Sequence, residues 1–231
     1  MGGLRRMDEG AVFPGSALTA SRFAEFLSQA YMGSDRQFGV DLQWGRCLHR
    51  AYLDFSRTLR GFAGCPEKSE RLQAAASWLE NRIAILDSSD RPVSQASFDT
   101  WHLETRRVLE ERLGTWKDGA AMQPGQSQKW VNMSLKYIYT LEALGVVRNF
   151  TPLRSGYKYA HLPLDRYVLS GLHARGCGAA RRWVEGWSTL DNDSYLDIQN
   201  WSRKHLADGK SLLDLDWELW SSRSWVPLTS A

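Results

Sequence analysis

The run of residues 129–144 constrains the fold of this chain most, because its helical pattern is apolar over much of its circumference. Val131, Leu135, Ile138 and Leu141 fall on one stripe at helical spacing, and a second apolar stripe lies beside it. A helix that is apolar on so many sides has to be surrounded by other elements. We therefore expect residues 129–144 to form a central, buried helix.

Most of the remaining sequence also repeats apolar residues at helical spacing, and no segment alternates as a half-buried strand would. The further predicted helices cover residues 21–31, 42–59, 70–86, 98–113 and 194–205, with one more that starts at residue 166. Residues 119–128 are rich in turn formers, and residues 145–159 are expected to be irregular and to face solvent. The sequence thus predicts an all-α, compact helical protein with a central helix-hairpin-helix-like unit.

The composition is that of a globular protein, with one exception. The chain has 231 residues, of which 43% are hydrophobic and 24% charged, so it is long enough to bury a core. Eleven tryptophans stand out. Packing in a core is the common role of tryptophan, and stacking on a nucleobase is the alternative.

Cysteine usage and hydropathy exclude several classes of protein. The three cysteines have no CxxC spacing, which argues against a disulfide framework and against a thiolate zinc site. We expect no metal and no cofactor. The first residues lack the apolar run of a signal peptide, and no stretch approaches the roughly 18 apolar residues that span a membrane. The expectation is a cytoplasmic protein that has no membrane partner.

The net charge of +3 is distributed unevenly along the chain. Residues 1–116 hold 15 basic and 15 acidic residues, residues 117–182 hold ten basic against three acidic, and residues 183–231 hold four basic and eight acidic. Such a basic segment suits a polyanion-binding surface, or equally a solvated helix face. We expect a single unit, 1–231, with two subdomains: 1–116 with 183–231 packed beside it, and 117–182.

Two charged residues stand at predicted helix starts within the basic segment. Lys129 follows a Pro-Gly turn, and Asp165 follows Pro163 in the position of an N-cap. A helix start directs unpaired backbone N–H groups outward, where they can hold a phosphate or keep an aspartate ionised. The pair supplies an amine and a carboxylate that could act together on a nucleotide.

The motifs around these two residues resemble a known family. Residues 125–129 read GQSQK and precede a helix, and residues 162–168 read LPLDRYV. They resemble the hairpin lysine and the Pro-x-Asp-x-x-Val segment of the helix-hairpin-helix DNA glycosylase superfamily, with a spacing similar to that of the archaeal 8-oxoguanine DNA glycosylase branch. The resemblance implies a DNA glycosylase, with or without AP-lyase activity, that removes a damaged or modified base. It implies that Lys129 attacks C1′ and forms a Schiff base while Asp165 assists.

This hypothesis carries further site residues and a requirement. Lysine attacks as the free amine, so its site should disfavour the ammonium through burial or nearby positive charge. A flipped base enters a pocket of aromatic and amide groups, and the local candidates are Trp130, Gln126 and Gln128. The candidates for contact with the DNA backbone are Gly125, Lys136, Arg166, Arg181 and Arg182.

A second hypothesis involves no catalysis. A lysine after a Pro-Gly turn and an aspartate N-cap are both common in helical proteins. The chain would then be a non-catalytic all-α module that binds nucleic acid through residues 117–182. Alternatively, it would bind a protein partner through the acidic, tryptophan-rich run 212–220. If the module binds nucleic acid, charge reversal at Arg181 and Arg182 would weaken that binding more than Lys129→Gln would.

Overall fold

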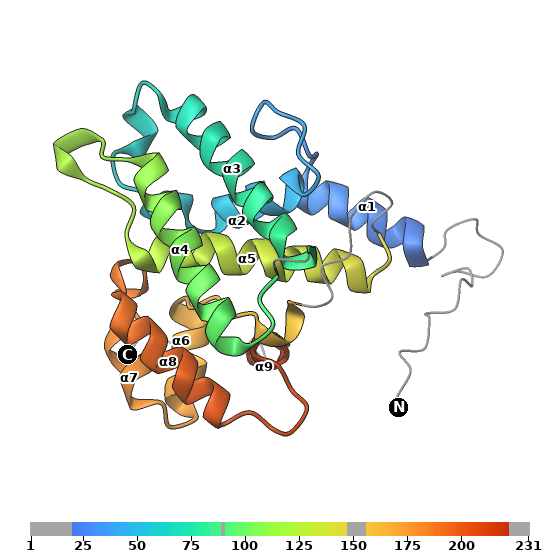
Figure 1. Ribbon diagram of the computed structural model, residues 1–231, viewed down its shortest axis with the longest axis vertical. Helices are drawn as coiled ribbons and strands as arrows, with labels where there is room; N and C mark the ends of the chain where they lie inside the picture. The colour runs from blue at the N-terminus through green and yellow to red at the C-terminus, as the bar shows by residue number, and fades with distance from the viewer. Residues whose placement is uncertain (1–19, 89–90, 147–155, 222–231) are drawn as a thin grey trace, which may run out of the picture.

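The structure is a computed structural model that describes residues 20–88, 91–146 and 156–221 (Figure 1). All regular elements in these ranges are helices, and a single antiparallel bridge joins Thr115 to Ala121. The all-α prediction is therefore confirmed. The α-helices are α1 (Ala20–Met32), α2 (Gly45–Phe55), α3 (Lys68–Ala84), α4 (Gln95–Leu113), α5 (Pro124–Ala143), α6 (Arg166–Ala174), α7 (Gly178–Trp183), α8 (Asn192–Lys204) and α9 (Leu212–Ser221). None of them is both long and apolar enough to cross a membrane.

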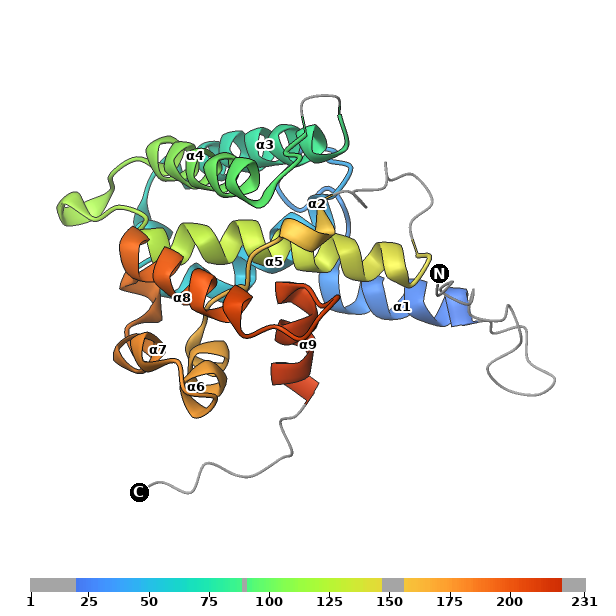
Figure 2. The same cartoon turned by 60° about the horizontal axis from the view of Figure 1, so that its bottom comes forward.

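Helix α5 occupies the centre of the fold, as its apolar pattern predicts. Every residue from Gly125 to Tyr139 is buried. It packs against α2, α4 and α8. Figure 2 shows it between the layer formed by α3 and α4 and the group formed by α6 to α9.

Helix α5 begins earlier than the sequence predicts. Pro124 takes its first position, where the missing N–H group costs no hydrogen bond. The Gln126 side chain accepts the backbone N–H of Gln123 at 2.8 Å and closes the helix start. Residues 124–128, the second half of the turn-rich run 119–128, therefore belong to α5. Lys129 lies in the second helical turn of α5 rather than the first. Residues 114–123 connect α4 to α5 as a hairpin that contains the Thr115–Ala121 bridge.

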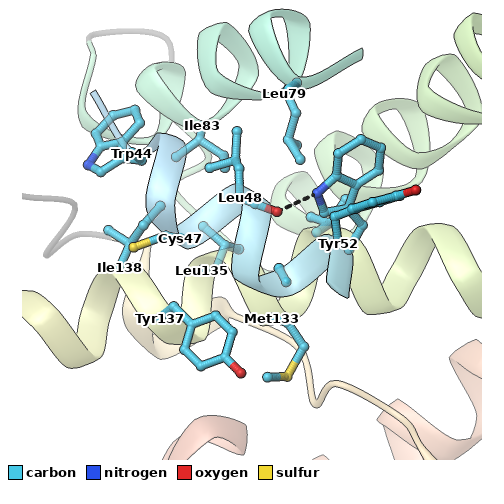
Figure 3. Packing of buried hydrophobic residues seen from close by; sticks show 14 of the residues in the cluster. Trp44, Cys47, Leu48, Tyr52, Leu79, Ile83, Met133, Leu135, Tyr137 and Ile138 are labelled. Atoms are coloured by element: carbon cyan, nitrogen blue, oxygen red, sulfur yellow. Dashed lines mark hydrogen bonds between the residues drawn. The ribbon is translucent and has the colours of Figure 1, made fainter. Parts of the chain in front are cut away.

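The buried apolar side chains form two clusters. The first cluster contains α2 to α5 and extends from Met32 to Ala160, with Leu213 added from α9. Figure 3 shows its centre, where Leu48 of α2 and Leu135 of α5 are buried. The second cluster joins α6 to α9. The clusters divide the chain near residue 161, whereas the sequence predicts subdomain borders at residues 116 and 183.

Two segments for which the sequence predicts no helix contain helical structure. The run 212–220 forms α9, whose Leu213 belongs to the first cluster and whose Leu212, Leu215 and Leu219 belong to the second. Within the predicted irregular stretch 145–159, residues 147–155 lie outside the described residues, and Tyr157–Tyr159 forms the short 3-10 helix η5. Helix α9 thus connects the two clusters.

The start of α5 depends on the absence of a side chain at Gly125. A Cβ atom there would lie 2.1 Å from the carbonyl oxygen of Trp187, in the 3-10 helix η6 (Trp187–Thr189). Gly125→Ala should therefore lower the free energy of unfolding by about 1–3 kcal/mol, measured by urea denaturation. The matched control is Gly178→Ala, because no atom lies within 4 Å of its Cβ position. Equal losses in the two variants would contradict this account.

Candidate active site

Lys129 and Asp165 form a buried ion pair between α5 and the start of α6. The Lys129 Nζ atom lies 2.6 Å from the Asp165 Oδ2 atom. The two residues are only 3% and 8% exposed. The amine and the carboxylate singled out in the sequence are therefore in direct contact inside the protein.

The two oxygens of Asp165 have separate partners. Oδ1 accepts the backbone N–H groups of Tyr167 and Val168, each at 2.9 Å, which confirms the predicted N-cap of α6. Oδ2 faces Lys129. Burial alone would raise the pKa of the Asp165 carboxyl, but the charge of Lys129 and the two N–H groups outweigh it and lower that pKa. The carboxylate is thus held in its ionised form.

Side-chain amides hold the irregular segment that leads to Asp165. Gln199 of α8 accepts the N–H of Leu162 at 3.0 Å and donates to its carbonyl at 2.9 Å. Gln128 of α5 accepts the N–H of Leu164 at 3.1 Å and donates to its carbonyl at 2.7 Å. Pro163, between them, has no N–H group to satisfy. These amides provide the hydrogen bonds that a neighbouring strand would provide in a sheet.

A second buried ion pair lies on the same helix. Lys136, two turns after Lys129, pairs with Asp216 of α9. The ammonium of Lys136 lies 4.5 Å from the ring centre of Trp217 and 5.4 Å from that of Trp220. Burial raises the pKa of Asp216, although the charge of Lys136 opposes this shift. No signal in the sequence connects Lys136 with Asp216, because 80 positions separate them.

The three expected base-binding residues have partners within the chain. Trp130 is fully buried, its ring lies near those of Tyr52 and Phe55, and its indole N–H donates to the carbonyl of Leu48 at 3.0 Å. Gln126 donates to the carbonyl of Thr58 at 3.0 Å. Gln128 binds Leu164. The structure brings only Gln128 to the segment that carries Asp165.

The expected DNA-backbone residues fall into two groups. Lys136 is 6% exposed, and Gly125 is covered by η6, so neither lies on the surface. Arg166, Arg181 and Arg182 are exposed on α6 and α7. The guanidinium of Arg182 lies 5.1 Å from the ring centre of Trp183.

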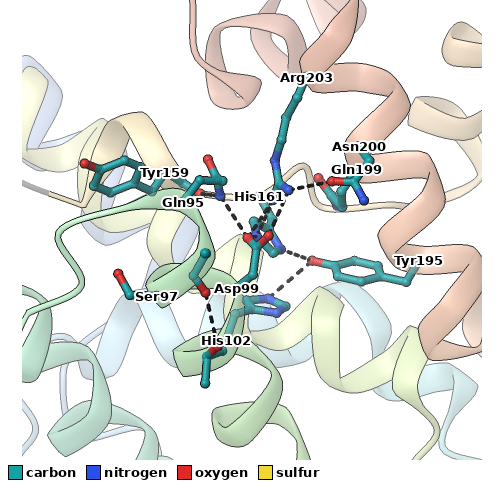
Figure 4. A network of polar contacts seen from close by, with 12 residues as sticks. Gln95, Ser97, Asp99, His102, Tyr159, His161, Tyr195, Gln199, Asn200 and Arg203 are labelled. Carbon is teal, nitrogen blue, oxygen red and sulfur yellow. Dashed lines mark hydrogen bonds and ion pairs between the residues drawn. The ribbon is translucent and has the colours of Figure 1, made fainter.

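A buried polar network borders the site (Figure 4). His161 Nε2 lies 2.6 Å from Asp99 Oδ1, and His161 Nδ1 lies 2.7 Å from the Tyr195 hydroxyl. Arg203 donates to both oxygens of Asp99, at 2.8 and 2.9 Å. The Arg203 guanidinium also lies 2.7 Å from His161 Nε2, and its positive charge disfavours a charged imidazole ring. The sequence assigns no role to these residues, which come from separate helices and one connecting segment.

Removal of one charge of the Lys129–Asp165 pair should be more damaging than removal of both. Lys129→Met leaves the Asp165 carboxylate buried without its cation, so it should lower the free energy of unfolding by about 3–5 kcal/mol. Lys129→Met combined with Asp165→Asn removes both charges and keeps an N-cap residue, so it should recover most of that loss. Urea denaturation of both variants measures the difference. Additive losses would show that the pair does not couple the two residues.

The His161 network predicts a dependence of stability on pH. Burial lowers the pKa of His161 to about 4, although the Asp99 hydrogen bond opposes this shift. Between about pH 6.5 and pH 4 the unfolded chain binds a proton that the folded chain does not, so stability falls as the pH falls.

His161→Gln should reduce the slope of the free energy of unfolding against pH by about 1.4 kcal/mol per pH unit, the value for one proton. Urea denaturation between pH 4.5 and 6 measures this slope. An unchanged slope would contradict this assignment. Part of the slope should remain in the variant, because burial also lowers the pKa of His102.

Comparison with family models, curated proteins and solved structures finds no match to this chain. The motifs around Lys129 and Asp165 and the geometry of their site are therefore the features that bear on function.

Proposed function

We propose that the protein is a DNA glycosylase, with or without AP-lyase activity, in which Lys129 is the nucleophile and Asp165 assists. The observation that supports this most is the 2.6 Å contact between the Lys129 amine and the Asp165 carboxylate, buried between two helices. A buried ion pair gains little stability over apolar packing. Buried pairs of titratable groups are common where an enzyme needs a prepared amine or carboxylate.

The two side chains are suited to the steps of base removal. As the base departs, positive charge develops on the sugar, and the ionised Asp165 carboxylate stabilises it. Asp165 stabilises the ammonium form of Lys129, so Lys129 has to lose a proton before it attacks C1′. Asp165 Oδ2 lies within hydrogen-bond distance to accept that proton and pass it to the departing base, which leaves the carboxylate ionised again. Because both residues are buried, a nucleoside reaches them only when elements packed on α5 move apart.

Aromatic side chains beside the second ion pair could receive the base. Trp217 and Tyr167 are each 42% exposed. The rings of Tyr167 and Trp220 are 5.5 Å apart. A flipped base stacks on such rings and forms hydrogen bonds through its edge. We therefore assign base binding to α9 and the start of α6 rather than to Trp130, Gln126 and Gln128.

The exposed arginines of α6 and α7 provide a surface for the DNA backbone. Arg181 and Arg182 are consecutive on α7, and Arg166 follows Asp165 directly. Arg166 lies 3.4 Å from Glu185 in a largely exposed pair, which holds it weakly. Phosphate groups of a duplex could contact these guanidinium groups while a base enters the site.

Borohydride trapping tests the proposed chemistry. Wild-type protein incubated with duplexes that carry candidate lesions, 8-oxoguanine among them, or an abasic site should form a covalent complex on reduction. Lys129→Gln should form none, since the nucleophile is absent. Asp165→Asn should lower the single-turnover rate about a hundredfold, because charge stabilisation is lost. Gel electrophoresis of labelled duplexes measures both effects, at a temperature where circular dichroism shows each variant to be folded.

The control for this assay is Lys158→Gln, which removes an exposed lysine of η5 and should trap as the wild type does. Wild-type protein that forms no covalent complex with any duplex would contradict the proposal. If such protein still bound DNA with strong salt dependence, the chain would be a nucleic-acid-binding module.

A further inference from the structure

Gln128 directly precedes Lys129 on α5, and its side chain binds the backbone directly before Asp165. The amide accepts the N–H of Leu164 and donates to the carbonyl of Leu164. It also donates to the carbonyl of Gly125 at 2.9 Å and accepts from Asn132 at 3.0 Å. Gln128 is completely buried. Every polar group of this amide is therefore used, and the amide has one defined orientation.

Two consecutive residues of α5 thus hold two consecutive residues of the facing segment. Gln128 binds the main chain of Leu164, and Lys129 binds the side chain of Asp165. The Oδ1 atom of Asp165 is fixed to the start of α6 by its N-cap bonds. The distance from Asp165 Oδ2 to Lys129 Nζ then depends on the position of residues 162–165 along α5. Gln128 fixes that position at Leu164, the residue directly before Asp165.

We infer that Gln128 is a positioning residue: it places the Asp165 carboxylate against the Lys129 amine. The role of this placement in catalysis rests on the proposed function, whereas the placement itself is a property of the DNA-free protein. Reacting groups that move by about 1 Å lose up to about a hundredfold in rate. A change at Gln128 should therefore act on the pair although Gln128 touches neither the substrate nor the reacting atoms.

Gln199 of α8 provides a matched control. It binds the N–H and the carbonyl of Leu162 in the same two-point manner, and it is equally buried. Leu162 lies three residues before Asp165, and no hydrogen bond joins Gln199 to Lys129 or Asp165 among the described residues. Substitution of Gln199 should remove a similar set of hydrogen bonds without moving the carboxylate.

The first experiment measures the ion pair without DNA. Labelled formaldehyde and a mild reductant are used to methylate the lysines of five full-length proteins: the wild type, Gln128→Asn, Gln128→Met, Gln199→Asn and Gln199→Met. Methylation of each lysine is quantified by peptide mass spectrometry. A displaced carboxylate stabilises the ammonium less, so the free amine is populated more often and Lys129 methylation should rise about tenfold in the Gln128 variants. Lys136, buried on the same helix and paired with Asp216, is the internal reference for general loosening.

The second experiment measures the rate of borohydride trapping under single-turnover conditions across pH. The Gln128 variants should trap ten- to a hundredfold more slowly, with an altered pH profile. The Gln199 variants should keep the wild-type profile and lie within about threefold of its rate, because Asp165 stays in place. The melting temperature of every variant is recorded, since both glutamines stabilise the fold.

The outcomes separate this inference from the proposed function. A ratio of Lys129 to Lys136 methylation that is unchanged in both Gln128 variants, or raised equally in the Gln199 variants, would overturn the positioning role. Selective methylation of Lys129 in the Gln128 variants supports that role even if the wild type forms no covalent complex with DNA. In that case only the proposed glycosylase activity would fail.

Discussion

The ion pair between Lys129 and Asp165 crosses the boundary between the two apolar clusters, and the arrangement of the site depends on it. One partner belongs to α5, the central helix of the first cluster, and the other starts α6 in the second cluster. Lys136 and Asp216 cross the same boundary two turns further along α5. A buried charge without its partner is costly, so each pair fixes how the clusters face each other. Gln128 and Gln199 lie at the same boundary, where they form hydrogen bonds with the backbone of Leu164 and Leu162.

A helix can be predicted where its apolar pattern runs over many residues or where capping residues mark its start. The apolar stripes of residues 129–144 identify α5, and the N-cap of α6 follows from Asp165 and the residues beside it. Helix α7 has only six residues, too few for a period of 3.6 to emerge. The first turns of α5 contain proline and glycine, which resemble a turn, but proline is favoured at a helix start. The division into clusters could not be predicted, because it depends on which faces of α5 the distant helices cover.

The candidate site was predictable only in part, for the same reason. Local motifs in the sequence identify Lys129 and Asp165, and the structure shows the two side chains in contact. The side of α5 that carries Trp130 faces α2, so its indole packs in the first cluster instead of beside the amine. The sequence predicts Lys136 as a surface cation, but its partner, Asp216, lies in the distant helix α9. A helix surrounded on all sides gives no sequence signal for which polar residue meets which neighbour.

The proposed function combines these features into one site. An amine and an ionised carboxylate are in contact, and the rings of Trp217 and Trp220 lie beside Lys136, the lysine of the second buried pair. The most direct test of the central claim is to locate the covalent bond by peptide mapping of the protein after borohydride reduction with abasic duplex DNA. The account predicts that the sugar adduct is attached to Lys129. An adduct on Lys136, on a surface lysine or on the amino terminus would contradict it.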